Sequence, residues 1–306
     1  MLLQNKIAQS RKALLVTAVY ALLVCFVCGI FEQNNWVQLV VLAVSSYLMV
    51  ELNNTNALIR VYSRMISCSY IMLYLMTGLI TSDEPVILVQ LCFIVFYLFL
   101  FSAYQEKDAV GRIFYAFTSL GIASVFFIQI LYLVPILWIL LRTNILALNI
   151  RTLSASILGL IMPYWVLGGY SLYTENINWL IGHFETFTRF APICDYQGLS
   201  AMQITLFAVL LLYTFTGIVH LLRNSYKDKI RTRMFFEIFM IVDLISIVCI
   251  VLQPQHYDIL IGIIVVNTSP IIAHFMALSS SKITNIAFFV IIAAVITLTM
   301  CNLWMF

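Results

Sequence analysis

Apolar residues in this chain fall in long, unbroken blocks that are separated by short polar segments. Blocks such as ALLVTAVYALLVCFVCGIF at 13–31 and ITLFAVLLLYTFTGIVHLL at 204–222 do not alternate between apolar and polar positions. Strands of a membrane barrel would alternate over about ten residues each, so the pattern excludes a barrel. Inside a bilayer the backbone has to satisfy its own hydrogen bonds, and the blocks therefore predict membrane-spanning helices.

Nine blocks have a length suited to crossing a bilayer, for which about 20 residues are needed. They lie at 13–31, 36–52, 58–80, 86–104, 152–173, 200–222, 234–252, 259–278 and 286–305. Composition agrees, because 63% of the residues are hydrophobic and only 9% are charged, whereas a soluble domain carries about 25% charged residues. We predict one all-α integral membrane domain, a transmembrane helical bundle that covers residues 1–306.

The apolar segment 113–141 is too long for one ordinary span and too short for two. Lys and Arg accumulate on the cytoplasmic side of membrane proteins. A single tilted helix at 113–141 would put Arg142, Arg151 and the basic loop 223–233 outside, whereas a hairpin leaves them in the cytoplasm. We therefore predict a short helical hairpin that is re-entrant or barely spans the bilayer. The alternative is one long helix that violates the charge rule.

This topology places the N-terminus in the cytoplasm and the C-terminus in the periplasm of a bacterial inner membrane. Of the 16 Lys and Arg residues, all except Arg189 then face the cytoplasm. The external loops carry acidic residues such as Glu32 and Asp258. The longest external segment, 174–199, contains several aromatic residues among polar ones, which is typical of a helix that lies in the membrane interface.

Asp243 is the most unusual residue of the pattern, because it lies near the middle of the block 234–252. An ionisable group at mid-span costs about 2.5–3.5 kcal/mol on insertion scales. The polar positions expected near its depth, or closer to the cytoplasm, are Glu237 on the same helix and Asn267, Thr268 and His274 on the next one. Asp243, Asn267 and His274 would form a proton relay or a cation site. The alternative is that Asp243 is only a hydrogen-bonded packing residue.

A second polar cluster lies in the segment ELNNTNALIRVYSR, which connects the second and third blocks. Arg60 and Arg64 are four residues apart, so on a helix they would share one face. Paired guanidinium groups bind phosphate through planar, bidentate contacts. With the amides of Asn53, Asn54 and Asn56 they would bind the anionic headgroup of a lipid phosphate or a polyprenyl phosphate. The alternative is a positive-inside anchor whose Arg side chains reach the lipid headgroups.

The sequence lacks the motifs of common cofactor and metal sites. It contains no Walker A, HExxH or GxSxG pattern, and no cluster of cysteines and histidines with metal-ligand spacing. Its four histidines divide between the two sides of the predicted topology, which argues against a histidine-bound iron oxygenase. We expect no cofactor, no metal and no nucleic-acid partner, and we expect membrane lipids as partners.

Three short motifs follow one another in the first part of the chain. They are an N-N-x-N segment after the second block, a charged turn before an aliphatic–aromatic hairpin, and an Arg-led G-x-x-x-P-Y span. The matching positions are Asn53, Asn54, Asn56, Arg112, 122–126, Arg151, Gly159, Pro163 and Tyr164. In this order they resemble a family of inner-membrane proteins of Bacteroidota. The chain departs from that family where LFSAYQEKD stands in place of a double Arg found in many relatives.

The resemblance implies a cell-envelope membrane protein and no established activity. Some relatives carry an automatic carotene-oxygenase label, which the placement of the histidines does not support, and some are associated with genes for polyprenyl-phosphate sugar synthesis. Three functions stay open. The first is handling of a lipid-linked or other anionic envelope precursor, by translocation or, if the chain is an enzyme, by glycosyl transfer. The second is an ion- or proton-coupled transporter of a small solute, with Asp243 as the coupling acid. The third is a non-catalytic membrane scaffold of an envelope complex.

Overall fold

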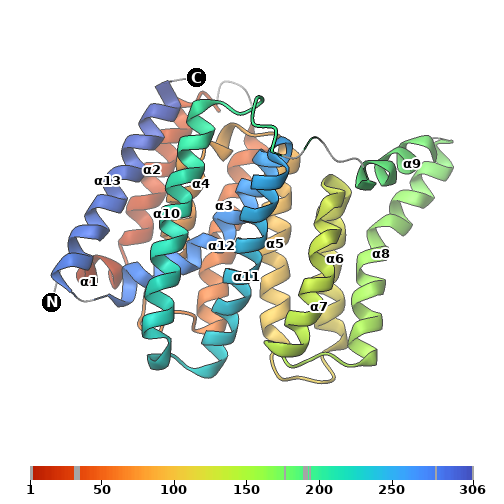
Figure 1. Cartoon of the computed structure of the whole chain (residues 1–306), viewed down its shortest axis with the longest axis horizontal. Coiled ribbons are helices and arrows are strands. Elements are labelled where there is room, and N and C mark those ends of the chain that lie inside the picture. The colour runs from red at the N-terminus through yellow and green to blue at the C-terminus, as the bar shows by residue number, and fades with distance from the viewer. Residues whose placement is uncertain are drawn as a thin grey trace.

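The computed structural model describes residues 3–30, 35–175, 177–188, 192, 194–279 and 281–304. Within these residues the chain contains helices and no strands, and most of the helices lie side by side in one bundle (Figure 1). The α-helices are α1 (Leu3–Ala8), α2 (Ala13–Val27), α3 (Trp36–Asn56), α4 (Met65–Met76), α5 (Glu84–Ser102), α6 (Val110–Phe126), α7 (Val134–Thr143), α8 (Ile150–Tyr173), α9 (Ile177–Glu185), α10 (Ala201–Asn224), α11 (Ile230–Leu252), α12 (Tyr257–Leu278) and α13 (Lys282–Trp304). The short 3-10 helices are η1 (Leu79–Thr81), η2 (Ile128–Leu133), η3 (Thr186–Thr188), η4 (Ser225–Lys227) and η5 (Pro254–His256).

Seven helices of the described residues are long and apolar enough to cross a membrane, namely α3, α5, α8, α10, α11, α12 and α13. They correspond to seven of the nine predicted blocks. The other two blocks form shorter helices, because α2 has 15 residues and α4 has 12. The prediction of an all-α transmembrane bundle is confirmed, and the chain is a multi-pass membrane protein.

The third block, predicted at 58–80, is shorter than expected at both ends. Ala57 follows α3 in a left-handed conformation (φ 49°), which ends the helix, and the chain then crosses to α4 without helical structure. At the other end Gly78 is also left-handed (φ 73°), which separates α4 from η1. All residues of α4 except Met72 are buried. A helix too short for a full span is tolerated there because protein surrounds it.

The central helix of the bundle is α12. It packs against α4, α5, α10 and α11, and Figure 1 shows it among them. In its most apolar window 94% of the residues are buried, compared with 56% or less in the other six long helices. A membrane helix enclosed by protein can carry polar side chains that lipid would not accommodate.

Residues 113–141 form the predicted hairpin. α6 ends where Phe127 adopts an extended conformation (φ −145°, ψ 93°), and η2 and α7 then return toward the starting end. The backbone N–H of Gln105 donates a hydrogen bond of 2.8 Å to the carbonyl of Ile145. The residues before and after the hairpin therefore lie at the same end of the bundle. The hairpin is confirmed, and the alternative of one long tilted helix is wrong.

The tip of the hairpin reaches the opposite end of the bundle. There the Phe127 ring packs against the ring of His256, just before α12, with 5.0 Å between the centroids. Tyr132 donates a hydrogen bond of 2.5 Å to the carbonyl of Phe187. Because α6 has 17 residues, it is about 26 Å long. The tip of the hairpin thus lies at the opposite end of the bundle, although each arm is shorter than the seven helices that are long enough to cross a membrane.

Two glycines allow α6 and α8 to pack backbone to backbone. A Cβ atom added at Gly159 of α8 would lie 2.6 Å from the carbonyl oxygen of Phe114. One added at Gly121 of α6 would lie 2.8 Å from the carbonyl oxygen of Leu160. Small residues that permit such close approach are a common basis of helix association in membranes. In Figure 1, α8 and α9 lie on the side of the molecule farthest from the N-terminus, and α6 lies between α5 and α8.

The two ends of the bundle differ in charge. The basic end carries Arg60, Arg151 and the segment 223–233, and both termini of the hairpin lie there. The acidic end carries Asp83 and Asp258, which line one cavity. How these ends face the two sides of the membrane stays a prediction. Glu32 and Arg189, to which the predicted topology assigned the outer side, lie outside the described residues.

Candidate functional site along the central helix

Polar residues follow one another through the buried middle of α12. Asn267, Thr268 and Ser269 are consecutive and fully buried, and Pro270 follows them directly. Because proline has no backbone N–H, the carbonyl of Val266 cannot receive its usual helical hydrogen bond. This stretch of the central helix therefore concentrates polar groups where the surrounding bundle excludes lipid.

Asp243 of α11 is fully buried and faces hydroxyl groups of two neighbouring helices. Its Oδ2 atom accepts a hydrogen bond of 3.2 Å from Thr214 of α10 and one of 3.1 Å from Thr268 of α12. The two hydroxyl oxygens also lie 2.8 Å from each other. The three oxygens form a closed triangle that links α10, α11 and α12.

This triangle has one contact more than two hydroxyl hydrogens can satisfy. Each threonine hydroxyl carries one hydrogen, and an ionised carboxylate carries none. All three contacts can be hydrogen bonds at the same time only when Asp243 carries a proton on Oδ2. The other carboxyl oxygen, Oδ1, is buried and has no hydrogen-bond partner among the described residues.

Asn267 has a different partner from its neighbour Thr268. Tyr97 of α5 donates a hydrogen bond of 2.6 Å from Oη to Asn267 Oδ1, and the Tyr97 ring packs against Phe239 with 4.8 Å between the centroids. Successive residues of a helix point about 100° apart, so Asn267 faces α5 while Thr268 faces α10 and α11. Of these two predicted neighbours of Asp243, the structure brings Thr268 to the carboxyl group and directs Asn267 to Tyr97.

Glu237 does not join either polar group of the interior. It is exposed, and it accepts a hydrogen bond of 2.7 Å from Asn144, which ties the end of α7 to α11. The adjacent residue Phe236 packs against the His274 ring with 5.0 Å between the centroids. His274 therefore lies at the depth predicted from Glu237, but the Glu237 side chain faces away from it.

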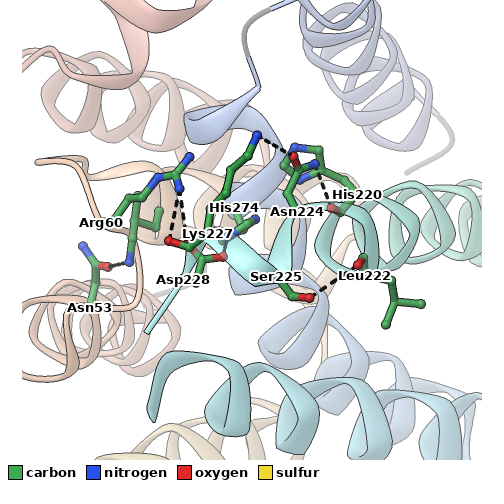
Figure 2. Close-up of polar contacts among 10 residues, drawn as sticks. Asn53, Arg60, His220, Leu222, Asn224, Ser225, Lys227, Asp228 and His274 are labelled. Atoms are coloured by element: carbon green, nitrogen blue, oxygen red, sulfur yellow. Dashed lines mark hydrogen bonds and ion pairs between the residues drawn. The ribbon is translucent and has the colours of Figure 1, made fainter. Parts of the chain in front are cut away.

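His274 belongs to a second polar site, at the basic end of α12 (Figure 2). Its Nε2 atom lies 3.0 Å from Asp228 Oδ2, and its side chain is fully buried. Arg60 lies 3.9 Å from the other carboxyl oxygen of Asp228 and donates a hydrogen bond of 3.4 Å to the carbonyl of Lys227. The ring centroid of His220 lies 5.4 Å from that of His274. These contacts hold the loop between α10 and α11 against the central helix.

The expected helical face shared by Arg60 and Arg64 is not formed. α3 ends at Ala57, so Arg60 lies in a non-helical segment and Arg64 stands just before the first turn of α4. Arg64 donates a hydrogen bond of 3.3 Å from Nε to the hydroxyl of Tyr62. Arg60 is engaged by Asp228 instead. The expectation was wrong because it began the third helix at residue 58, whereas α4 begins at Met65, after both arginines.

Two of the three predicted asparagines have partners inside the protein. Asn53 donates a buried hydrogen bond of 3.0 Å to the carbonyl of Ser63. Asn56 accepts one of 3.0 Å from Arg231. The first contact holds the turn between α3 and α4 and the second ties the end of α3 to α11, whereas Asn54 is exposed. The structure therefore gives Asn53 and Asn56 a bracing role and does not gather the three amides into one site.

Tyr97, Thr214 and Asp228 were not predicted from the sequence. Asp228 lies in the loop RNSYKDKIRTR, whose basic residues were interpreted only as an orientation signal. One acidic residue among five basic ones was the signal that could have identified it. Tyr97 and Thr214 gave no such signal, because isolated Tyr and Thr residues fit any of the apolar blocks.

A cavity of about 420 Å³ opens at the acidic end, over the start of α12. Asp83, Val86 and Asp258 are among the residues that line it. One turn further along α5, Gln90 is fully buried, and its Nε2 atom has no hydrogen-bond partner in the described part of the chain. Gly262 of α12 makes room for it, because a Cβ atom there would lie 2.6 Å from Gln90 Nε2. Polar groups thus occur along α12 from the acidic end to the basic end.

Comparison with known proteins finds no family model, no curated protein and no solved structure that matches this chain. In the described ranges no three His, Cys, Asp or Glu side chains are grouped so that they could hold a metal ion. The fold and the site define a multi-pass α-helical membrane protein with a buried acidic group at its centre.

Proposed function

We propose that the chain is a proton-coupled transporter of a small solute and that Asp243 takes up and releases the coupling proton. The observation that carries the proposal is the triangle of Asp243, Thr214 and Thr268, which needs a proton on the carboxyl group to satisfy all its contacts. Such a site gains a hydrogen bond when the acid is protonated and loses one when the acid is ionised. An acid with only a packing role would not need this dependence.

Protonation of Asp243 would affect helix packing because the triangle joins three helices. When the proton leaves, one contact of the triangle loses its hydrogen, and α10 and α12 are held together less strongly. Gly217 lies about one turn from Thr214, and a Cβ atom added there would lie 2.6 Å from the side chain of Ile271. Two helices in such close contact can pivot about that point while the triangle opens or closes.

The cavity at the acidic end offers space for the solute. Its volume of about 420 Å³ falls within the range of about 300–1,000 Å³ that small-molecule sites occupy. Asp83, Gln203 and Asp258 give it a polar lining. This lining suits a small polar solute better than an apolar one, since carboxylate and amide groups offer it hydrogen bonds.

The proposal is tested by infrared difference spectroscopy of the reconstituted protein during a pH titration. The method detects the carbonyl stretch of a protonated carboxyl group. We expect a carboxylic-acid band that loses intensity as the pH rises and that is absent from Asp243→Asn. Glu237→Gln is the matched control, because Glu237 is an exposed acid on the same helix, and it should keep the band. Superimposable spectra of the wild type and Asp243→Asn would overturn the proposal.

A second candidate function is supported by a groove on the lipid-facing side of the bundle. α2 and α13 both pack on α4, and between them lies a groove of about 460 Å³ with an almost entirely apolar lining. Lys12 lines it at the basic end. An apolar chain with an anionic headgroup fits this arrangement. The second candidate is therefore handling of a lipid-linked envelope precursor such as a polyprenyl phosphate, in agreement with the resemblance to the Bacteroidota proteins, which stays a prediction.

Mass spectrometry of co-purified lipids tests this second candidate. Lys12→Glu should lower the amount of bound phosphate-containing lipid, because it reverses the charge at the mouth of the groove. Lys282→Glu is the control, since Lys282 is exposed and does not line the groove. Equal amounts of lipid phosphate in the two variants would exclude the groove as the binding site.

A further inference from the structure

We infer that Asp228 and His274, with His220 beside them, form the site through which protons pass between Asp243 and the aqueous phase at the basic end. The inference rests on the proposed function of Asp243. It assigns a role to three titratable residues outside the Asp243 triangle, one on the central helix and two on elements packed against it.

The contact with Asp228 indicates which nitrogen of His274 carries the proton. A carboxylate only accepts hydrogen bonds, so Nε2 of His274, which lies 3.0 Å from Asp228 Oδ2, is the donor. In a neutral ring Nδ1 is then a bare acceptor. Nδ1 of His274 is buried and has no partner within the described ranges, and the same holds for Nδ1 of His220. His274 therefore combines an engaged donor with a free acceptor that can take a proton.

The charged and titratable groups around His274 come from three elements (Figure 2). Asp228 and Lys227 belong to the loop between α10 and α11, His220 belongs to α10, and Arg60 belongs to the segment between α3 and α4. The Asp228 side chain is 5% exposed, whereas that of Arg60 is 41% exposed. The site thus extends from the fully buried His274 to a solvent-exposed guanidinium group, as a proton exchange site at the end of the bundle requires.

A short apolar stretch separates this site from Asp243. His274 follows Thr268 on α12 by about 9 Å along the helix axis. Over that distance Phe236 packs against His274, and Ile271 packs against Gly217. Unpartnered buried atoms lie on both sides, namely one carboxyl oxygen of Asp243 and the Nδ1 atoms of the histidines, within the limits of the described residues. Buried polar atoms without protein partners are where ordered water is expected. Water that enters when α10 and α12 pivot about Gly217 and the triangle opens would complete the path.

Each transfer along this path moves one proton and no other atom. Asp243 gives its proton through water to Nδ1 of His274, and the ring becomes an imidazolium. The imidazolium then gives its Nε2 hydrogen to the Asp228 carboxylate, which releases it to water at the basic end. A water-mediated transfer of the remaining ring hydrogen from Nδ1 to Nε2 restores the starting tautomer. The charge left on the Asp243 carboxylate is removed by the next proton, so no further reactant is needed.

The test measures how fast the Asp243 carboxyl proton exchanges for deuterium when the reconstituted protein is transferred to D₂O. The shift of the carboxylic-acid band reports the exchange. We expect His274→Gln to slow it by about 100-fold, the lower end of the effect of a positioned acid–base group. Glutamine can keep the hydrogen bond to Asp228 but cannot relay a proton at neutral pH, so a purely structural role of His274 predicts no change. His183→Gln, at the acidic end, is the matched control and should exchange at the wild-type rate.

Asp228→Asn provides a second variant, and it should slow the exchange as well because an amide does not accept the proton. Size-exclusion chromatography confirms that each variant is folded before the measurement. Wild-type exchange rates in both His274→Gln and Asp228→Asn would overturn the inference while leaving Asp243 as the proton site. Absence of the Asp243 band from the wild type would instead overturn the proposed function, and this inference with it.

Discussion

Tyr97 donates a hydrogen bond of 2.6 Å to Asn267, and this contact joins α5 to the central helix deep inside the bundle. The next residue of α12, Thr268, contacts Asp243 on the other side. Two consecutive residues of one helix are thus tied to different neighbours. A rotation of α12 by one residue position would break both contacts, so together they define how the helix is turned about its own axis.

Tyr97→Phe should destabilise the protein by about 1–3 kcal/mol, because it leaves the buried Asn267 Oδ1 atom without its donor. Unfolding of the detergent-solubilised protein by a denaturing detergent measures the change. Tyr115→Phe serves as the control, since Tyr115 is an exposed aromatic residue on α6, and it should cost less than about 0.5 kcal/mol. Equal stability of the two variants would contradict the assigned role of Tyr97.

Gly159→Ala should separate α6 from α8, because the added Cβ atom would lie 2.6 Å from the carbonyl oxygen of Phe114. Overpacking of this kind costs about 1–3 kcal/mol. Gly168→Ala, on the same helix, meets no atom within 4 Å and should stabilise the helix by about 0.5–1 kcal/mol through its backbone entropy. Thermal unfolding in detergent compares the two variants, and the same sign of change in both would count against the close contact.

Thr214→Val and Thr268→Val should each destabilise the protein, and their effects should not add. Each removes a hydroxyl from the triangle around Asp243, at a cost of about 1–3 kcal/mol. Because the two hydroxyls contact each other, we expect a coupling energy of about 0.5–3 kcal/mol in the double variant. Thr216→Val is the control, since Thr216 is exposed and its hydroxyl donates a hydrogen bond to the carbonyl of Tyr213 on its own helix. Strict additivity would show that the three groups do not act as one unit.

A cysteine at Thr143 should be protected from a membrane-impermeant maleimide applied to the outside of intact cells. Thr143 is exposed at the end of α7, at the basic end, which the charge distribution places in the cytoplasm. Gln255→Cys is exposed at the acidic end and should be labelled. Both variants are made after the exposed Cys194 and Cys301 are replaced by Ser. Labelling of Thr143→Cys but not of Gln255→Cys would show that the orientation is the reverse of the predicted one.

Docking of α9 on the hairpin should weaken as the pH falls below about 6.5, which is the ordinary pKa of a histidine side chain. His183 Nε2 lies 3.2 Å from the carbonyl of Ser124, and burial lowers the pKa of His183 although this hydrogen bond partly opposes the shift. A lowered pKa means that the undocked segment binds more protons, so docking is stable above that pH and is lost below it. Limited proteolysis of residues 177–188 on either side of this pH measures the effect. His183→Gln should show no such pH dependence, and a persistent dependence in that variant would assign it to another group.

The charge distribution along the chain was sufficient to predict the hairpin at 113–141 but not the ends of the helices. Arg142 and Arg151 required that 113–141 return to its starting side, and the structure has that hairpin. The same reasoning could not place the start of α4, which begins at Met65 and not at residue 58. Hydropathy and charge give the extent of an apolar block but do not show where within it the helix begins. The expectation for Arg60 and Arg64 was wrong because both residues precede that start.

The candidate site could be predicted from the sequence only through one residue, Asp243. Asp243 stood out because an acid inside a membrane span is expensive. Its partner Thr214 did not, because hydropathy gives the depth of a residue but not which helices are neighbours across the bundle. Asp228 was missed for a different reason. Its loop contains five basic residues, so only the excess of positive charge was considered and the single acidic residue was not.

The enclosed position of α12 also constrains how the protein is assembled. The helices that surround it, α4, α5, α10 and α11, all precede it in the chain. These four helices can therefore already be in the membrane when α12 is synthesised. The polar side chains of α12, such as Asn267 and His274, can then be buried without first being exposed to lipid. A bundle that formed in the reverse order would have to shelter these side chains from lipid before their partners were made. The helix with these buried polar residues is thus synthesised after the helices that enclose it.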